Sequence, residues 1–231
     1  MKFPKSKQGD EKMNTDSQDR KGEMQVETRG NYLIQAQQAK KHFLTYDQEK
    51  IIRKLGLSFD EQYLYIKMLC KLYRLERTAA DLQRQEGEQW VDANSYEEVM
   101  TLLDLVCDSR EDRFLTGRWK SMESFGLQFH QNLLQEQKDP LACLVDVQPE
   151  QFLAACRKLG GLPIDMGDLG FRLEVFDGLE IAVLFWQGDE EFLPRIRYLW
   201  DENALQYLRY ETMYFAVSLL RQRIWQEMGA K

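Results

Sequence analysis

The sequence predicts an α+β fold in which antiparallel sheets are surrounded by helices. Period-two hydrophobic alternation occurs in two separate groups, one within residues 62–92 and one within residues 170–200. Segments with helical periodicity precede, separate and follow these groups. Strands that cluster in this way pair as antiparallel neighbours, whereas a wound parallel sheet alternates strands with helices. We therefore expect a single domain over residues 31–231, behind a disordered N-terminal tail.

The tail is predicted from its composition. Residues 1–30 contain seven Lys or Arg, six Asp or Glu and only five apolar residues. These apolar residues follow no regular period and are too few to bury against a core. We expect residues 1–30 to be a solvated, disordered leader.

Two helices are expected at the start of the ordered part. The second begins after an N-cap at Asp47 and ends before Gly56, because glycine readily takes the left-handed conformation that terminates helices. Its apolar face consists of Ile51, Ile52 and Leu55. The first is indicated by residues at i, i+4, i+7 and i+11, which are Tyr32, Ala36, Ala39 and Phe43.

The first group of strands lies within residues 62–92. Alternation over 62–68 and 72–76 predicts two short strands that form a hairpin near residues 69–71. A third, weaker strand is expected over 80–85. Glu86 and Gly87 form the next turn, and the chain returns over 88–92.

The clearest helix signal in the first half is a capping box formed by Ser95 and Glu98. Residues 110–120 are expected to be a loop. Helical spacing resumes over 122–133, interrupted by Gly126, and we expect it to end at Asp139 and Pro140, because proline cannot continue a helix. The apolar stripe behind the capping box is Val99, Leu102, Leu103 and Val106.

The second half carries more consistent signals. Pro149 at the first helical position and the pair Gly160–Gly161 at the end predict a helix between them. Asp177 and Gly178 predict a tight hairpin between strands over 170–176 and 179–187. A third strand is expected over 193–200. The final helix is indicated by a stripe of Met213, Val217, Leu220 and Ile224.

Charge and hydropathy exclude several classes of function. The 31 basic and 38 acidic residues give a net charge of −7, so nucleic acid is not an expected partner. The longest apolar run, residues 181–186, is far shorter than the ~20 residues of a membrane span. The N-terminus lacks the apolar stretch of a signal peptide. We expect a soluble cytoplasmic protein with no membrane partner.

Cysteine and histidine usage indicates no cofactor or catalytic centre. The four cysteines, Cys70, Cys107, Cys143 and Cys156, follow no zinc or disulfide spacing and lie among apolar residues. We expect them to be free thiols. His42 and His130 lie at helical positions beside apolar residues, without a second catalytic group at a recognised spacing. No nucleotide-binding or zinc-protease motif occurs.

One group of acidic residues is the main candidate for a ligand site. In an antiparallel arrangement of the strands 170–176, 179–187 and 193–200, the start of the first lies at the same sheet end as the loop between the other two. Five carboxylates converging there would need a cation, and oxygen ligands suit Mg²⁺ or Ca²⁺. The alternative is that these acids only stabilise turns. The residues concerned are Asp165, Asp168, Asp189, Glu190 and Glu191.

Aromatic residues concentrate in the last third of the chain. Trp186 lies in a run that is apolar on both faces, which predicts a largely buried position on the central strand of the C-terminal sheet. Trp186 and Trp200, beside the acidic edge, are candidates for an aromatic pocket that holds a flat or cationic ligand. The alternative is that both rings belong to the core.

Five segments in the second half of the chain form a recognisable pattern, namely Gly160–Gly161, Gly167–Asp168, 183–192, 198–201 and 206–208. The specific part is the W-x-G-D-E-E-F stretch. This pattern resembles that of a bacterial and archaeal family catalogued as domain of unknown function 3786. The similarity runs from about Asn31 to about Leu220, and Trp200–Asp201 replaces the Phe-Asp of the family pattern.

The resemblance implies an uncharacterised accessory or binding module, associated with anaerobic metal or corrinoid metabolism. Some longer relatives carry a four-cysteine iron–sulfur segment. The first sixty-nine residues of this chain contain no cysteine, so we expect no iron–sulfur cluster and predict no cofactor. The partner is expected to be a protein or a small molecule. The alternative function is a carboxylate-based enzyme, or a binder that depends on a divalent cation at the acidic edge.

Overall fold

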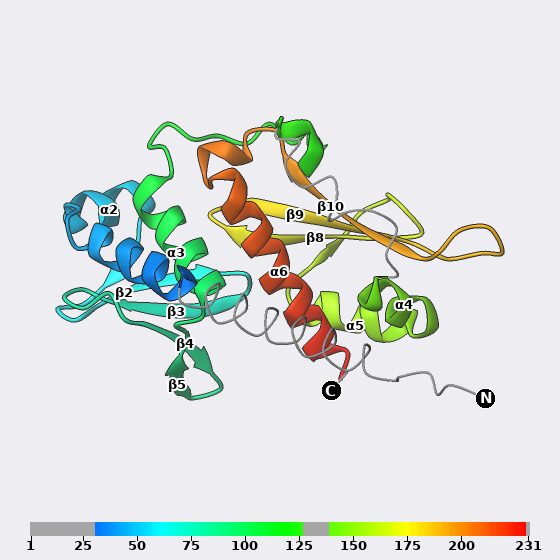
Figure 1. Ribbon diagram of the computed structural model, residues 1–231, viewed down its shortest axis with the longest axis horizontal. Coiled ribbons are helices and arrows are strands. Elements are labelled where there is room, and N and C mark those ends of the chain that lie inside the picture. The colour runs from blue at the N-terminus through cyan, green and yellow to red at the C-terminus, as the bar shows by residue number, and fades with distance from the viewer. Residues whose placement is uncertain (1–30, 127–138, 230–231) are drawn as a thin grey trace, which may run out of the picture.

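The computed structural model describes residues 31–126 and 139–229 of the chain. It contains two five-stranded antiparallel sheets with helices between and around them (Figure 1), which confirms the α+β prediction. The predicted tail, His130 and most of the helix predicted over 122–133 lie outside the described residues. Within the described part of the chain, no helix is both long and apolar enough to span a membrane.

The first sheet is a meander whose strands follow one another in chain order. Both predicted hairpins are present, and Tyr65 pairs with Arg74 across the first of them. Leu64, Ile66 and Leu75 are buried and alternate with more exposed residues, so one face of the sheet forms the core. The strands are β1 (Ser58–Phe59), β2 (Tyr63–Met68), β3 (Lys71–Glu76), β4 (Leu82–Glu86) and β5 (Gln89–Asp92).

The second sheet has the strand order β6-β10-β9-β8-β7, so β9 is central. Asp177 and Gly178 both have positive φ, 50° and 79°, as a two-residue hairpin turn with matching twist requires. The predicted hairpin is therefore confirmed. The strands are β6 (Trp119–Ser121), β7 (Leu162–Pro163), β8 (Leu169–Phe176), β9 (Leu179–Trp186) and β10 (Arg195–Asp201).

Most predicted helices begin and end at the expected caps. The Asp47 carboxylate accepts hydrogen bonds from the amides of Glu49 and Lys50, and Gly56 ends the helix with φ 60°. The Ser95 hydroxyl accepts from the amide of Glu98. The elements are helical residues 31–43, α2 (Gln48–Leu55), α3 (Tyr96–Asp108), α4 (Pro140–Val147), α5 (Pro149–Lys158), α6 (Tyr210–Glu227) and the 3-10 turns η1 (Met122–Phe125) and η3 (Ala204–Gln206).

Asp139 and Pro140 begin helix α4, a start that the sequence pattern did not predict, whereas the predicted helix end before them lies outside the described residues. The Asp139 carboxylate accepts from the amide of Leu141 at 2.9 Å, and Pro140 occupies the first position of α4, where its missing N–H costs nothing. The loop predicted over 110–120 is two residues too long, because Trp119 and Lys120 already pair with β10 as part of β6. Strands β1 and β7 have two residues each, too few to produce a periodic signal.

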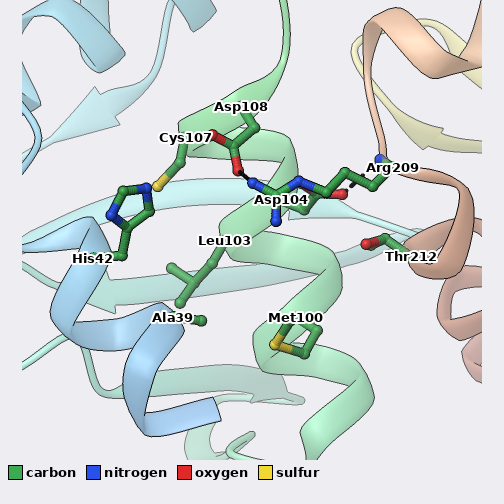
Figure 2. A pocket seen from close by; sticks show the side chains of 9 residues that line it. All are labelled: Ala39, His42, Met100, Leu103, Asp104, Cys107, Asp108, Arg209 and Thr212. Atoms are coloured by element: carbon green, nitrogen blue, oxygen red, sulfur yellow. Dashed lines mark hydrogen bonds and ion pairs between the residues drawn. The ribbon is translucent and has the colours of Figure 1, made fainter. Parts of the chain in front are cut away.

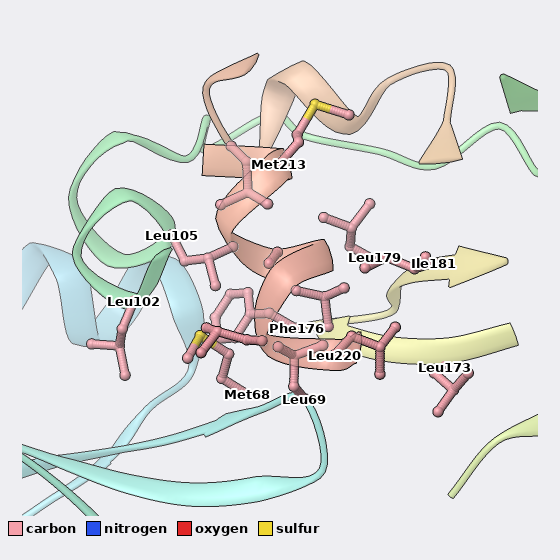
Figure 3. Close-up of a cluster of buried hydrophobic side chains, with 14 of the residues drawn as sticks. Met68, Leu69, Leu102, Leu105, Leu173, Phe176, Leu179, Ile181, Met213 and Leu220 are labelled. Atoms are coloured by element: carbon pink, nitrogen blue, oxygen red, sulfur yellow. The ribbon is translucent and has the colours of Figure 1, made fainter. Parts of the chain in front are cut away.

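Helix α6 crosses the centre of the molecule between the two sheets (Figure 1). Figure 3 shows Leu105 of α3 pointing toward α6, and Met213 and Leu220 of α6 near the second sheet. All of these residues belong to a hydrophobic cluster that includes both sheets. Met213, Leu220 and Ile224 of the predicted stripe are buried, and Val217 is half-buried. Because both sheets and α3 surround α6, its buried surface is wider than one stripe and also includes Ala216, Leu219 and Arg223.

Candidate functional site

The five predicted acidic residues lie on the loops at one end of the second sheet. Leu169 pairs with Phe185, so Asp168 lies beside the loop that follows β9, as predicted. The Asp168 carboxylate accepts from the amide of Gln187 at 2.8 Å. All five are exposed, namely Asp165, Asp168, Asp189, Glu190 and Glu191.

Asp189 stabilises its own turn. Its Oδ1 accepts from the amides of Glu191 at 2.8 Å and Phe192 at 2.7 Å, and these hydrogen bonds lower the pKa of the Asp189 carboxyl. Among the described residues, no three His, Cys, Asp or Glu side chains are close enough to hold a metal ion. The contacts of Asp168 and Asp189 favour the turn interpretation, and cation binding at this edge stays a prediction.

The two candidate tryptophans are not brought together. Trp186 pairs with Arg195, whereas Trp200 pairs with Ile181, five residues along β9 from Trp186, or about 17 Å in a strand. Trp200 is fully buried. Trp186, at the end of β9, is half-buried beneath the Arg195 guanidinium, 4.9 Å from the ring centroid. The two rings therefore do not line one common pocket, and Trp186 is less buried than predicted because its strand ends there.

A different site lies between helical residues 31–43, α3 and the start of α6 (Figure 2). It is a pocket of about 70 Å³, several times the space that one water molecule needs. One side is apolar, and the other carries carboxylates, a guanidinium, a hydroxyl, a thiol and an imidazole. The lining residues are Ala39, His42, Met100, Leu103, Asp104, Cys107, Asp108, Arg209 and Thr212.

Asp104 is the buried acid of this pocket. Its side chain is only 5% exposed, and its Oδ2 accepts from the amide of Arg209 at 2.7 Å. Asp104 Oδ1 lies 3.4 Å from Arg209 Nε, yet it has no hydrogen-bond partner within the described chain. Burial raises the pKa of the Asp104 carboxyl. The Thr212 hydroxyl and the Arg209 guanidinium both interact with this carboxylate and favour its charged form, so Asp104 is a buried acid in the pocket wall whose Oδ1 makes no hydrogen bond of good geometry.

The rim of the pocket is a hydrogen-bonded network around Asp108. The Arg209 guanidinium and the Tyr46 hydroxyl both donate to Asp108, the latter at 2.7 Å. Tyr46 Oη also lies 3.1 Å from His42 Nε2. Burial and the hydrogen bond to Asp108 raise the pKa of Tyr46 to about 12. These contacts hold the imidazole and the guanidinium at the entrance, where the Arg209 side chain is 60% exposed.

Cys107 faces the pocket as a protonated thiol. It is buried, and burial raises the pKa of the Cys107 thiol to about 12, so thiolate is scarce at neutral pH. Lys54 donates to the carbonyl oxygens of Cys107 and Ser109, at 3.2 and 2.9 Å, so its ammonium group stabilises the end of α3.

Sequence reasoning missed Asp104, Asp108 and Arg209. One signal was available, since Asp104 interrupts the apolar run 102–106 of a helix whose face was predicted to be buried. A carboxylate in such a position requires a specific partner. The partner, Arg209, lies 105 residues away, and local patterns do not reveal it.

Comparisons with known proteins identify a family but no relative of known activity. A family model described as Domain of unknown function (DUF3786) matches residues 47–223, more than half of the chain. No curated protein and no solved structure matches the chain.

Proposed function

Since the chain belongs to the family described as domain of unknown function (DUF3786), we propose its function from the pocket: it is an accessory binding module whose ligand is a small amine or amide. The observation that carries this proposal is the buried Asp104 carboxylate in the pocket wall, whose Oδ1 lies 3.4 Å from Arg209 Nε but makes no hydrogen bond within the described chain. An N–H group of a ligand satisfies this oxygen.

The charges of the lining favour a neutral or cationic ligand over an anionic one. Two carboxylates, Asp104 and Asp108, line the pocket together with one guanidinium, that of Arg209. Asp104 and Asp108 both interact with Arg209, so the guanidinium is already neutralised. Ala39, Met100 and Leu103 provide an apolar side that accommodates a short hydrocarbon part of the ligand.

The protonation states of Cys107 and Tyr46 support binding without catalysis. A nucleophilic cysteine needs a lowered pKa, whereas burial raises that of Cys107. Tyr46 also has a raised pKa, so its hydroxyl remains protonated and holds Asp108 in place. These groups position the pocket wall and carry no activated nucleophile.

The test is an NMR titration of isotope-labelled protein with methylammonium chloride and with acetamide, at constant ionic strength. Saturable shifts are expected for the amides of residues 100–108 and 209–212. Acetate, which is anionic and has no N–H donor, serves as the negative probe.

Variants assign the response to the pocket. Asp104→Asn replaces the carboxylate, which accepts hydrogen bonds, by an amide. This variant is expected to show no saturable shifts. Asp168→Asn, at the far sheet edge, is expected to keep them. Should Asp104→Asn fold poorly, Ala39→Leu fills the pocket and leaves Asp104 in place. Equal shifts in the parent and in either pocket variant would contradict the proposal.

Two finer expectations remain predictions. Cytoplasmic location and an association with anaerobic metal or corrinoid metabolism rest on composition and on the family resemblance, and the pocket bears on neither. The alternative, a carboxylate-based enzyme or a cation-dependent binder, rests on the acidic edge, whose Asp168 and Asp189 bind backbone amides.

A further inference from the structure

The hairpin loop between β9 and β10 extends beyond the rest of the second sheet (Figure 1). Two adjacent large apolar residues lie in this loop, and Phe192 is 68% and Leu193 is 58% exposed. Single exposed apolar residues are common on protein surfaces. Phe192 and Leu193 are adjacent, so together they present one small apolar patch on a projecting hairpin.

The loop is held in one conformation by hydrogen bonds. The amide of Asp189 donates to the Phe192 carbonyl at 2.9 Å, and the Asp189 carboxylate accepts from the amide of Phe192. The Gly188 amide donates to Asp146 of α4 at 3.0 Å. A Cβ at Gly188 would lie 2.7 Å from Pro194 Cδ, so only glycine allows the loop to close at this point. An ordered loop loses little conformational entropy on binding.

The charge around the apolar pair is predominantly negative. Glu190 and Glu191 are exposed in the same loop, and Asp165 and Asp168 lie on the adjacent loop. Two exposed cations follow the loop on β10, namely Arg195, which stacks on Trp186, and Arg197. The loop thus presents apolar side chains between carboxylates, a combination complementary to a segment with apolar and basic side chains.

We infer that this loop is a docking surface for a protein segment that carries Lys or Arg between apolar residues. A second copy of the chain is disfavoured as the occupant, since each copy has a net charge of −7 and would place carboxylates against carboxylates. The inference is independent of the pocket, which lies between other elements of the fold.

The test uses fluorescence anisotropy with a labelled twelve-residue peptide of mixed Lys and Leu, and with a matched peptide in which Glu replaces Lys. The full chain is expected to bind the Lys peptide and not the Glu peptide. Phe192→Ser combined with Leu193→Ser is expected to weaken binding at least tenfold. The control Phe59→Ser removes a ring that is 52% exposed on β1 and is expected to change affinity less than twofold.

Charge and self-association are tested separately. Glu190→Gln with Glu191→Gln leaves the hydrogen bonds of Asp189 in place, and it is expected to weaken binding and to reduce its dependence on salt. Equal affinity in the parent and the Phe192/Leu193 variant, or no binding by the parent, would overturn the inference. Sedimentation that shows a dimer dissociated by the same double substitution would assign the surface to a second copy instead.

Discussion

The guanidinium of Arg223, on α6, donates a hydrogen bond to the carbonyl oxygen of Leu69, in the turn between β2 and β3. Arg223 is buried and donates also to the carbonyl of Met68 at 3.1 Å and to the hydroxyl of Tyr73. The amide of Leu69 donates to Val175 of β8 at 2.8 Å. One turn therefore joins the first sheet, the second sheet and the helix between them.

The same turn places two residues other than glycine in the left-handed region. Leu69 has φ 47° and Cys70 has φ 63°, a conformation that costs roughly 1 kcal/mol or more per residue of this type. The contacts that hold it are the hydrogen bonds of Leu69 and burial of its side chain, which is 2% exposed and packs with the residues shown in Figure 3. Tertiary contacts thus impose the turn conformation.

Arg223→Leu is expected to lower the free energy of unfolding by about 3 kcal/mol, because buried carbonyls and the Tyr73 hydroxyl lose their donor. Urea unfolding followed by circular dichroism measures this change. The control is Gln222→Leu, an exposed neighbour on α6, with an expected effect within about 0.5 kcal/mol. A similar decrease in the free energy of unfolding in both variants would show that the hydrogen bonds of Arg223 do not stabilise the fold.

The thiols of Cys107 and Cys156 are expected to resist alkylation in the native protein. Burial raises the pKa of each to about 12, so the reactive thiolate is scarce. Iodoacetamide at pH ~8, with peptide mass spectrometry, is expected to label them at least about a hundredfold more slowly than in urea-unfolded protein. Labelling of native Cys107 at the unfolded rate would instead support a nucleophilic role in the pocket.

Asp104 is expected to make stability depend on pH in the opposite sense to most carboxylates. Burial raises its folded-state pKa above the ordinary 3.8, so the folded protein binds a proton that the unfolded chain releases. This contribution is fully present below the ordinary pKa and is lost as the pH rises through the raised value. The free energy of unfolding of the parent, relative to that of Asp104→Asn, is therefore expected to fall as the pH rises from 3.8 through the raised pKa of Asp104. A rising or constant difference would contradict the assignment.

Asp189→Ala is expected to lower the melting temperature equally in chelator and in millimolar Mg²⁺ or Ca²⁺, because it removes the acceptor for two amides. The lowered pKa of Asp189 means that this contribution exists above the ordinary carboxyl pKa and is lost as the pH falls through the lowered one. Glu190→Ala, in the same loop, is the control. Stabilisation of the parent by metal, absent from Asp189→Ala, would establish the acidic edge as a cation site.

The two tryptophans are expected to differ in acrylamide quenching. A variant with Trp200 alone resists quenching, because this side chain is fully buried. A variant with Trp186 alone is quenched to an intermediate degree, since Arg195 covers one face of a half-buried ring. Equal quenching of both variants would contradict the separation that the register of β9 and β10 requires.

The sequence by itself determined the elements whose signals are local. The caps at Asp47 and Ser95 and the turn at Asp177 and Gly178 depend on side chains within three residues of the backbone groups that they serve. Hydrophobic periodicity placed the longer strands and helices for the same reason. The helix start at Asp139 and Pro140 was not predicted, because a proline beside an aspartate is compatible with the end of one helix and with the start of another.

Only the tertiary structure decided which residues meet. Asp104 and Arg209 form the pocket because α3 packs against the start of α6, and Arg223 meets Leu69 because α6 lies between the sheets. The pairing of β6 with β10 likewise joins segments about eighty residues apart. In each of these contacts a polar group finds its hydrogen-bond partner in a segment distant in sequence. Such pairs produce no periodic pattern in the chain.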